Sequence, residues 1–231
     1  METLYICIIL IFIILIAKYY RNTYEGFDTK MYRLGDMITN RGGGRERKGF
    51  GFDYHIKHFP NSIATEYMLK TEKTKDFNTL LDIINKRQPK FYPDDTIVIH
   101  LRIGDVIDNT NVSLDDILTD YTKYSNGHQY VKPIKYYTNL IDTINSYKIK
   151  KILLIGGFHR KGNHDKSLQY VNHIKQHFEN NGFNCTTRIN HNADEDFLIM
   201  CNSKYFVPSG GGFSSIIKQM VILKGGTVIE P

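Results

Sequence analysis

Apolar residues are spaced differently before and after about residue 94, and the two parts of the pattern predict different elements. In the first part, helical spacing of Ile and Leu predicts short helices over residues 62–69 and 77–85, with Pro60-Asn61-Ser62 as a start signal for the first. In the second part, short runs of aliphatic, β-branched and aromatic residues predict strands over residues 96–101, 151–155, 205–208 and 227–229.

Amphipathic segments lie between the predicted strands. A helix is expected to begin at Ser113, where Asp116 occupies the capping-box position. Further helices are predicted over residues 133–147, 167–178, 193–202 and 213–223. Strands that alternate with helices are typical of a parallel sheet. The sequence therefore predicts an α/β fold, with a Rossmann-like parallel sheet and flanking helices.

The N-terminal segment Leu4–Ala17 is almost unbroken in its apolar character. It is shorter than the roughly 20 residues of a usual membrane span, but Tyr19 and Tyr20 suit the interface and Lys18 can extend its stem to it. Residues 1–21 are therefore predicted to form a single-pass transmembrane anchor. The alternatives are a cleaved signal peptide, disfavoured by the missing basic start and cleavage site, and a buried helix, disfavoured by the missing polar face.

The orientation of this predicted anchor stays open. Lys18 and Arg21 lie on its C-terminal side, which by the positive-inside rule places the main domain in the cytosol. Glycosylation sequons at Asn111 and Asn184 favour the opposite, lumenal side.

Composition removes several classes of function. Hydrophobic residues make up 41% of the chain and charged residues 23%, which is typical of a globular protein and not of a disordered one. The net charge of +6 suits an anionic ligand, a membrane surface or a nucleic acid, but the basic residues are scattered and no nucleic-acid-binding motif is present. No nucleic-acid partner is therefore expected. The three cysteines form no CxxC pair and the histidines lack ligand spacing, so neither a metal nor a cofactor is expected.

Candidate chemistry lies where two predicted strands end. His100 and Arg102 follow the strand at residues 96–101, and Ser209–Gly212 follows the strand at residues 205–208, directly before a helix. Ligands of parallel sheets bind at this carboxyl edge, and the amides of a glycine-rich helix start favour a phosphate. An arginine adds two parallel hydrogen bonds to such an anion. The pattern indicates a diphosphate clamp; the alternative is an ordinary strand-turn-helix with an exposed arginine. Asp105 is expected to brace Arg102 or to cap a helix, more than to act as a base.

Two segments resemble the donor-binding motifs of the fucosyltransferase superfamily. The segment Ile99–Asp105 reads IHLRIGD, and the family has His-x-Arg-Arg-(Gly/Thr)-Asp or, in protein O-fucosyltransferases, His-Leu-Arg-Ile-Gly. The segment Ala193–Cys201, followed by Ser209–Ser215, is similar to a second block with an Asp-Phe-(Leu)-Met-x-x-Cys helix and a Ser-Ser-Phe-Ser turn. This chain has Ile103 where many members carry a second arginine. The resemblance covers the chain from about Thr96.

The resemblance implies the C-terminal half of a GT-B-type fold, with residues 95–231 as nucleotide-sugar-binding domain and residues 22–94 as a short acceptor-side or linker region. It implies metal-free, inverting transfer of a sugar, fucose above all, from a GDP-sugar to a glycan or protein. Arg102 would be the catalytic residue that stabilises the leaving diphosphate. The implied donor-binding residues are His100, Arg102, Asp194, Asp196, Gly211, Gly212, Phe213 and Ser214. The alternative is a membrane-anchored protein that binds a nucleotide-sugar, or serves a structural role, without turnover.

Overall fold

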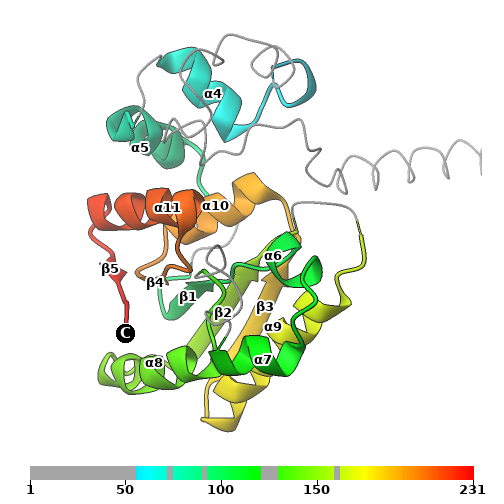
Figure 1. Cartoon of the computed structure of the whole chain (residues 1–231). Helices are drawn as coiled ribbons and strands as arrows, with labels where there is room; N and C mark the ends of the chain where they lie inside the picture. Colours follow the sequence, from blue (N-terminus) through cyan, green and yellow to red (C-terminus); the bar gives the residue numbers. More distant parts are fainter. Residues whose placement is uncertain (1–55, 72–74, 90–92, 121–129, 159–161) are drawn as a thin grey trace, which may run out of the picture.

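The computed structural model describes residues 56–71, 75–89, 93–120, 130–158 and 162–231. Their centre is a parallel sheet of five strands in the order β3-β2-β1-β4-β5, with helices on both faces (Figure 1). The predicted α/β class with a Rossmann-like parallel sheet is confirmed. The strands are β1 (Thr96–His100), β2 (Lys151–Gly156), β3 (Asn184–Ile189), β4 (Tyr205–Val207) and β5 (Thr227–Val228).

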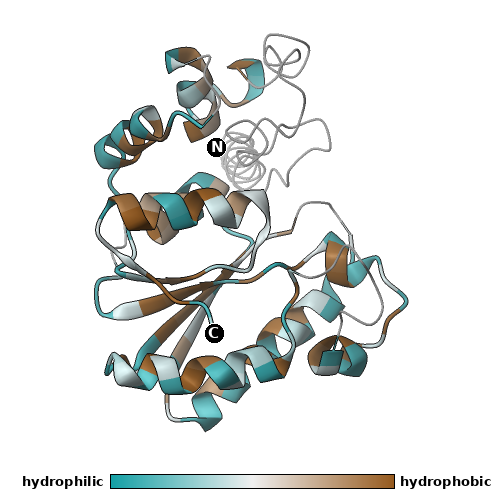
Figure 2. Cartoon of the chain, turned by 60° about the vertical axis from the view of Figure 1, so that its left-hand side comes forward, coloured by the Kyte–Doolittle hydropathy of each residue, from teal (hydrophilic) through white to brown (hydrophobic). Residues whose placement is uncertain are grey.

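Alternate residues of the central strands enter two separate hydrophobic cores. Ile97 and Ile99 of β1 pack on one side of the sheet, and Val98 packs on the other. Because side chains alternate along a strand, a strand covered on both faces must be apolar at successive positions. This explains why β1 and β2 read as unbroken aliphatic runs, and Figure 2 shows these apolar strands between the helices of the two faces.

The helices are divided between the two faces of the sheet. One core contains residues of α8 (Ile134–Ser146) and α9 (Asp165–Asn180), and the other contains residues of α10 (Ala193–Cys201) and α11 (Gly211–Leu223). Two short helices, α6 (Asp105–Asp108) and α7 (Leu114–Asp120), lie between β1 and α8 in the chain. Ser113 Oγ accepts the N–H of Asp116 at 3.1 Å, so the predicted start of α7 is confirmed.

Two N-terminal helices form an additional layer outside α10 and α11. They are α4 (Ile63–Lys70) and α5 (Phe77–Lys86), which match the two predicted helices, and Ser62 accepts the N–H of Thr65 as the expected cap of α4. Figure 1 shows them above α11, and Tyr67 and Ile83 share a hydrophobic core with Phe197 of α10. These helices therefore belong to the same folded body as the sheet. The proposed division at residue 94 and the acceptor-side or linker role of residues 22–94 stay predictions.

Strand β3 and helix α6, both within the described residues, are elements that the sequence pattern did not predict. Strand β3 lies at an edge of the sheet, where Cys185 is its one buried residue and Thr186 and Thr187 are exposed. Strongly polar edge strands lack the apolar alternation on which strand prediction depends. The one-turn helix α6 follows Gly104, whose φ of 83° turns the chain sharply after β1.

The predicted anchor, Leu4–Ala17, lies outside the described residues and stays a prediction. Within the part of the chain that the structure describes, no helix combines the length and the apolar character needed to cross a membrane.

Candidate functional site

The order of the strands reverses direction at β1 and β4. From β1 the chain proceeds through β2 to β3 on one side, whereas β4 leads to β5 on the other. The pairing of Ile99 with Val207 brings the ends of β1 and β4 to the same edge of the sheet. In open parallel sheets the connections diverge at such a point, and ligands bind in the crevice outside the carboxyl ends of the strands. Both candidate segments lie at this point.

His100 joins the two segments directly. Its Nδ1 lies 2.9 Å from Oγ of Ser214 and 2.9 Å from Oγ of Ser209. The N–H of Ser209 in turn donates to Oγ of Ser214 at 3.0 Å, and both serines are buried. The ring of Phe213 meets the imidazole edge-on, with centroids 5.6 Å apart. The end of β1 and the turn before α11 are therefore held together by hydrogen bonds between residues more than a hundred positions apart.

The turn before α11 presents backbone amides instead of side chains. Gly210 has a φ of 101° and Gly211 a φ of 77°, and the N-cap position makes no side-chain hydrogen bond. The first N–H groups of a helix lack partners within the helix, and together with the helix dipole they favour an anion. Gly211, Gly212 and Phe213 thus place their amides at the carboxyl edge of the sheet. This arrangement suits a phosphate or diphosphate.

Tyr130, which sequence reasoning missed, packs its ring against this turn. A Cβ atom on Gly210 would lie 2.5 Å from Cδ1 of the Tyr130 ring, so the ring rests against the glycine backbone. No local signal marks Tyr130, because it precedes a helix by several residues and reaches the turn only through the tertiary fold. Position 210 therefore favours glycine for two reasons, the positive φ of its backbone and the close contact with the Tyr130 ring.

Arg102 lies two residues beyond β1 and is held in a fixed position. Its NH2 group donates to Oδ1 of Asp105 at 2.7 Å, and its NH1 group donates to the carbonyl of Ile103 at 2.7 Å. The two side chains are 16% and 19% exposed, so the guanidinium is partly open to solvent. These bonds use two of the five N–H donors of an arginine. Asp105 therefore braces Arg102, in agreement with the structural role expected for it.

The two candidate carboxylates of α10 contact other parts of the protein. Oδ2 of Asp194 accepts the N–H of Ile63 at 2.7 Å and so caps α4, while Oδ1 of Asp196 accepts Nε of Arg188 at 2.5 Å. The His100–Ser214 cluster and the Arg102 bridge do not include either residue. Their role toward a base or ribose stays a prediction. Among the described residues, no three His, Cys, Asp or Glu side chains are grouped as a metal site requires.

Asp196 is expected to make stability depend on pH. Burial raises the pKa of its carboxyl to about 6, while the hydrogen bond from Arg188 acts in the opposite direction. Between pH about 4 and about 6 the folded protein keeps a proton that the unfolded chain has lost, so the free energy of unfolding falls as pH rises. The amide of Asp196→Asn does not titrate. We therefore expect the melting temperature of this variant, relative to that of the wild type, to increase as the pH rises from about 4 to about 6.

The measurement is the melting temperature of both proteins from pH 4 to pH 7. Asp95→Asn serves as control, because the hydrogen bond from Lys151 lowers the pKa of Asp95 and its contribution is lost as pH falls instead. Parallel pH profiles for Asp196→Asn and the wild type would contradict the prediction.

Comparison with known proteins gives structural similarity alone. No protein-family model matches the chain, and no curated protein does. A solved structure of POFUT1 in complex with GDP-fucose has 12% identity and a TM-score of 0.36, over 68% of this chain and 45% of that chain. A POFUT1 complex with GDP has 12% identity and a TM-score of 0.38, over 67% and 46%. A second GDP complex has 12% identity and a TM-score of 0.36, over 78% and 57%. The chain thus spans about half the length of the structures that it matches.

Proposed function

We propose that this protein is a fucosyltransferase-like glycosyltransferase, anchored in a membrane by Leu4–Ala17, that binds a GDP-sugar between the ends of β1 and β4. One observation carries the proposal. The HLRIGD segment and the glycine turn, which resemble the two donor motifs of that superfamily, meet through the hydrogen bond between His100 and Ser214 at the topological switch point.

The proposed chemistry follows from the charges at this edge. Transfer of a sugar breaks the bond to the diphosphate, and negative charge develops on the departing GDP. Arg102 neutralises this charge through charge-assisted hydrogen bonds, and the amides of Gly211 and Gly212 add fixed dipoles at the start of α11. Groups that are already oriented before reaction stabilise the developing charge without reorganising, and no metal is required for this effect. The acceptor hydroxyl, from a glycan or a protein, attacks the opposite face of the sugar and inverts its configuration, and the products are the glycosylated acceptor, GDP and the proton of the hydroxyl.

A second candidate function is binding of a nucleotide-sugar without transfer. Many members of the superfamily carry a second arginine at the position of Ile103. Here Ile103 is fully buried and lies close to Gly156, so this position supplies core packing instead of charge. The one arginine of the segment is held by Asp105, an arrangement that would also serve a protein that binds the diphosphate without transfer.

A nucleotide panel tests the proposal on the full chain. We expect GDP and GDP-fucose to raise the melting temperature by several degrees at about 100 times Kd, since such an excess adds roughly 2.7 kcal/mol to the free energy of unfolding. Guanosine, which lacks phosphates, is the matched control and should give no shift. If neither GDP nor GDP-fucose gave a shift, the proposed donor site would be wrong.

Release of free GDP from GDP-fucose separates the two candidate functions. Transfer to an added glycan or peptide acceptor supports the enzyme, whereas a shift in melting temperature without any GDP release supports the binding protein.

A further inference from the structure

A pair of reciprocal hydrogen bonds joins the β1–α6 loop to the start of α9. The N–H of Gly104 donates to Oγ of Ser167 at 2.9 Å, and the N–H of Ser167 donates to Oδ1 of Asp108 at 3.0 Å. Each segment thus satisfies a backbone amide of the other with a side chain. Ser167 is 0% exposed, so neither bond competes with water.

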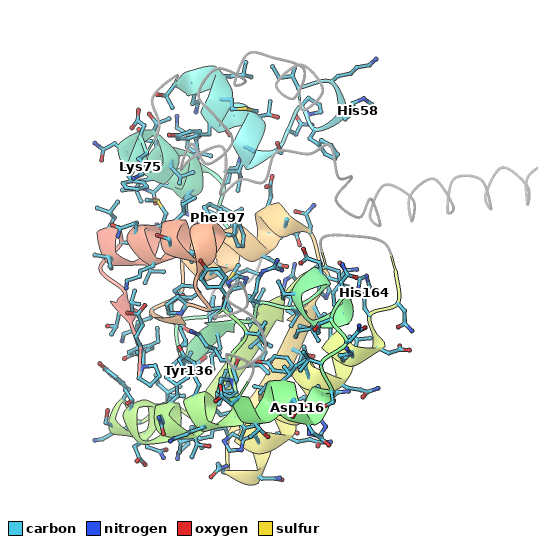
Figure 3. The ribbon with its side chains drawn as sticks, in the orientation of Figure 1. His58, Lys75, Asp116, Tyr136, His164 and Phe197 are labelled. Carbon is cyan, nitrogen blue, oxygen red and sulfur yellow. The ribbon has the colours of Figure 1, made fainter. Side chains whose placement is uncertain are left out.

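His164 extends this connection to the neighbouring strand. Its Nδ1 lies 2.8 Å from Oδ2 of Asp108, and its ring stacks on Phe158, with centroids 3.9 Å apart and planes 10° from parallel. Phe158 lies two residues beyond the end of β2, so the carboxyl ends of β1 and β2 are linked through Asp108. Figure 3 shows the labelled His164 beside α6, at the start of α9.

The position of Arg102 depends on this connection. The carbonyl of Gly104 accepts the N–H groups of Ile107 and Asp108, both at 2.8 Å, and these bonds form the single turn of α6. A helix of four residues is unstable alone, because its formation fixes several dihedrals for few hydrogen bonds. Asp105, which braces Arg102, is its first residue. Loosening Gly104 or Asp108 would therefore release the brace.

We propose that Ser167 and Asp108 are positioning residues that hold Arg102 for the diphosphate of the donor through Gly104 and Asp105. This inference rests on the proposed function, because it takes Arg102 to be the diphosphate ligand. Neither residue touches the donor. Both act by keeping the guanidinium where its remaining N–H groups face the incoming anion.

A double-mutant cycle on the full chain, with GDP as probe, tests the proposal. Ser167→Ala is expected to weaken GDP binding about tenfold in the wild type and by less than about twofold in an Arg102→Ala background. Asp108→Ala should behave alike, and Asp108→Asn, which keeps an oxygen for the N–H of Ser167, should retain most of the affinity. If Ser167→Ala does not fold, the Asp108 pair completes the cycle.

Ser203→Ala is the matched control. Its buried Oγ donates to the carbonyl of Met200 at 2.7 Å, just before β4 and at the opposite edge of the sheet. This variant should lose stability but keep its GDP affinity.

Equal losses of GDP affinity in the wild-type and Arg102→Ala backgrounds, or unchanged affinity in Ser167→Ala and Asp108→Ala, would overturn the positioning role. A wild type that binds no GDP would overturn the proposed function, and the inference with it; a wild type that binds through Arg102 but ignores Ser167 and Asp108 would overturn the inference alone.

Discussion

Arg102→Ala is expected to weaken GDP binding by about two orders of magnitude. A bidentate contact between a guanidinium and a phosphate contributes about 3 kcal/mol, which corresponds to roughly a hundredfold change in Kd. The side chain is already held by Asp105 and by the carbonyl of Ile103, so little of this contribution is lost to ordering the arginine. The measurement is the Kd of GDP by calorimetry, at a temperature where the variant is folded.

Two further variants separate the roles of shape and charge. Arg102→Lys keeps the charge but loses the planar pair of donors, so we expect its affinity to fall about tenfold, between that of the wild type and of Arg102→Ala. Lys175→Ala removes a positive charge from the far end of α9, where it pairs with Glu179 on the surface, and should leave the Kd unchanged. Arg102→Ala with wild-type affinity would show that the diphosphate binds elsewhere.

Gly210→Ala is expected to lower the free energy of unfolding by about 3 kcal/mol, or the melting temperature by about 6 to 12 °C. The backbone at Gly210, with φ of 101° and ψ of −179°, lies in a region that is nearly restricted to glycine. In addition, the new Cβ would lie 2.5 Å from the ring of Tyr130, so the ring or the turn must move. Because this turn sets the direction of the first amides of α11, GDP affinity should fall with stability.

Substitutions at two other glycines separate the cost of the positive φ from the cost of the clash with Tyr130. Gly182 has a φ of 82° but open space around its Cβ position, so Gly182→Ala should show the conformational cost alone, about 1 kcal/mol. Gly157 has open space as well, and Gly157→Ala should be close to neutral. Adding Tyr130→Ala to Gly210→Ala should recover part of the loss. The explanation would fail if Gly210→Ala were no more destabilising than Gly182→Ala.

Much of the fold could be predicted from local pattern because burial on both faces leaves a clear signature. The aliphatic runs at β1 and β2 are such signatures, and both strands lie where they were predicted. The cap at Ser113 is a second kind of local signal, a side-chain hydrogen bond to the helix backbone, and it is also where it was predicted. Strand β3 was missed because an edge strand with exposed threonines carries almost no hydrophobic signal. The position of α4 and α5 was also not predictable, since an amphipathic stripe shows that a helix packs but not against which partner.

The candidate site likewise has features that the sequence predicted and contacts that only the structure shows. The residue types were visible in the sequence: an arginine after a strand and a glycine turn before a helix. The sheet-edge rule predicted that both would lie at the carboxyl edge, but it did not predict their direct contact, because the pairing of β1 with β4 joins segments more than a hundred residues apart. The partner of Asp194 and the ring of Tyr130 against Gly210 likewise come from elements distant in the chain. Arg188, the partner of Asp196, lies only eight residues before it.

The sequence by itself determined the α/β class, most of the elements and the chemistry available at two strand ends. These properties are local, since hydrophobic period, caps and glycine turns act over a few residues. Only the tertiary structure decided that His100 and Ser214 touch at the switch point, and that Arg102 is braced by Asp105 on a turn bonded to Ser167. Such contacts depend on strand order and helix packing, and these are determined by interactions between residues that are far apart in the chain.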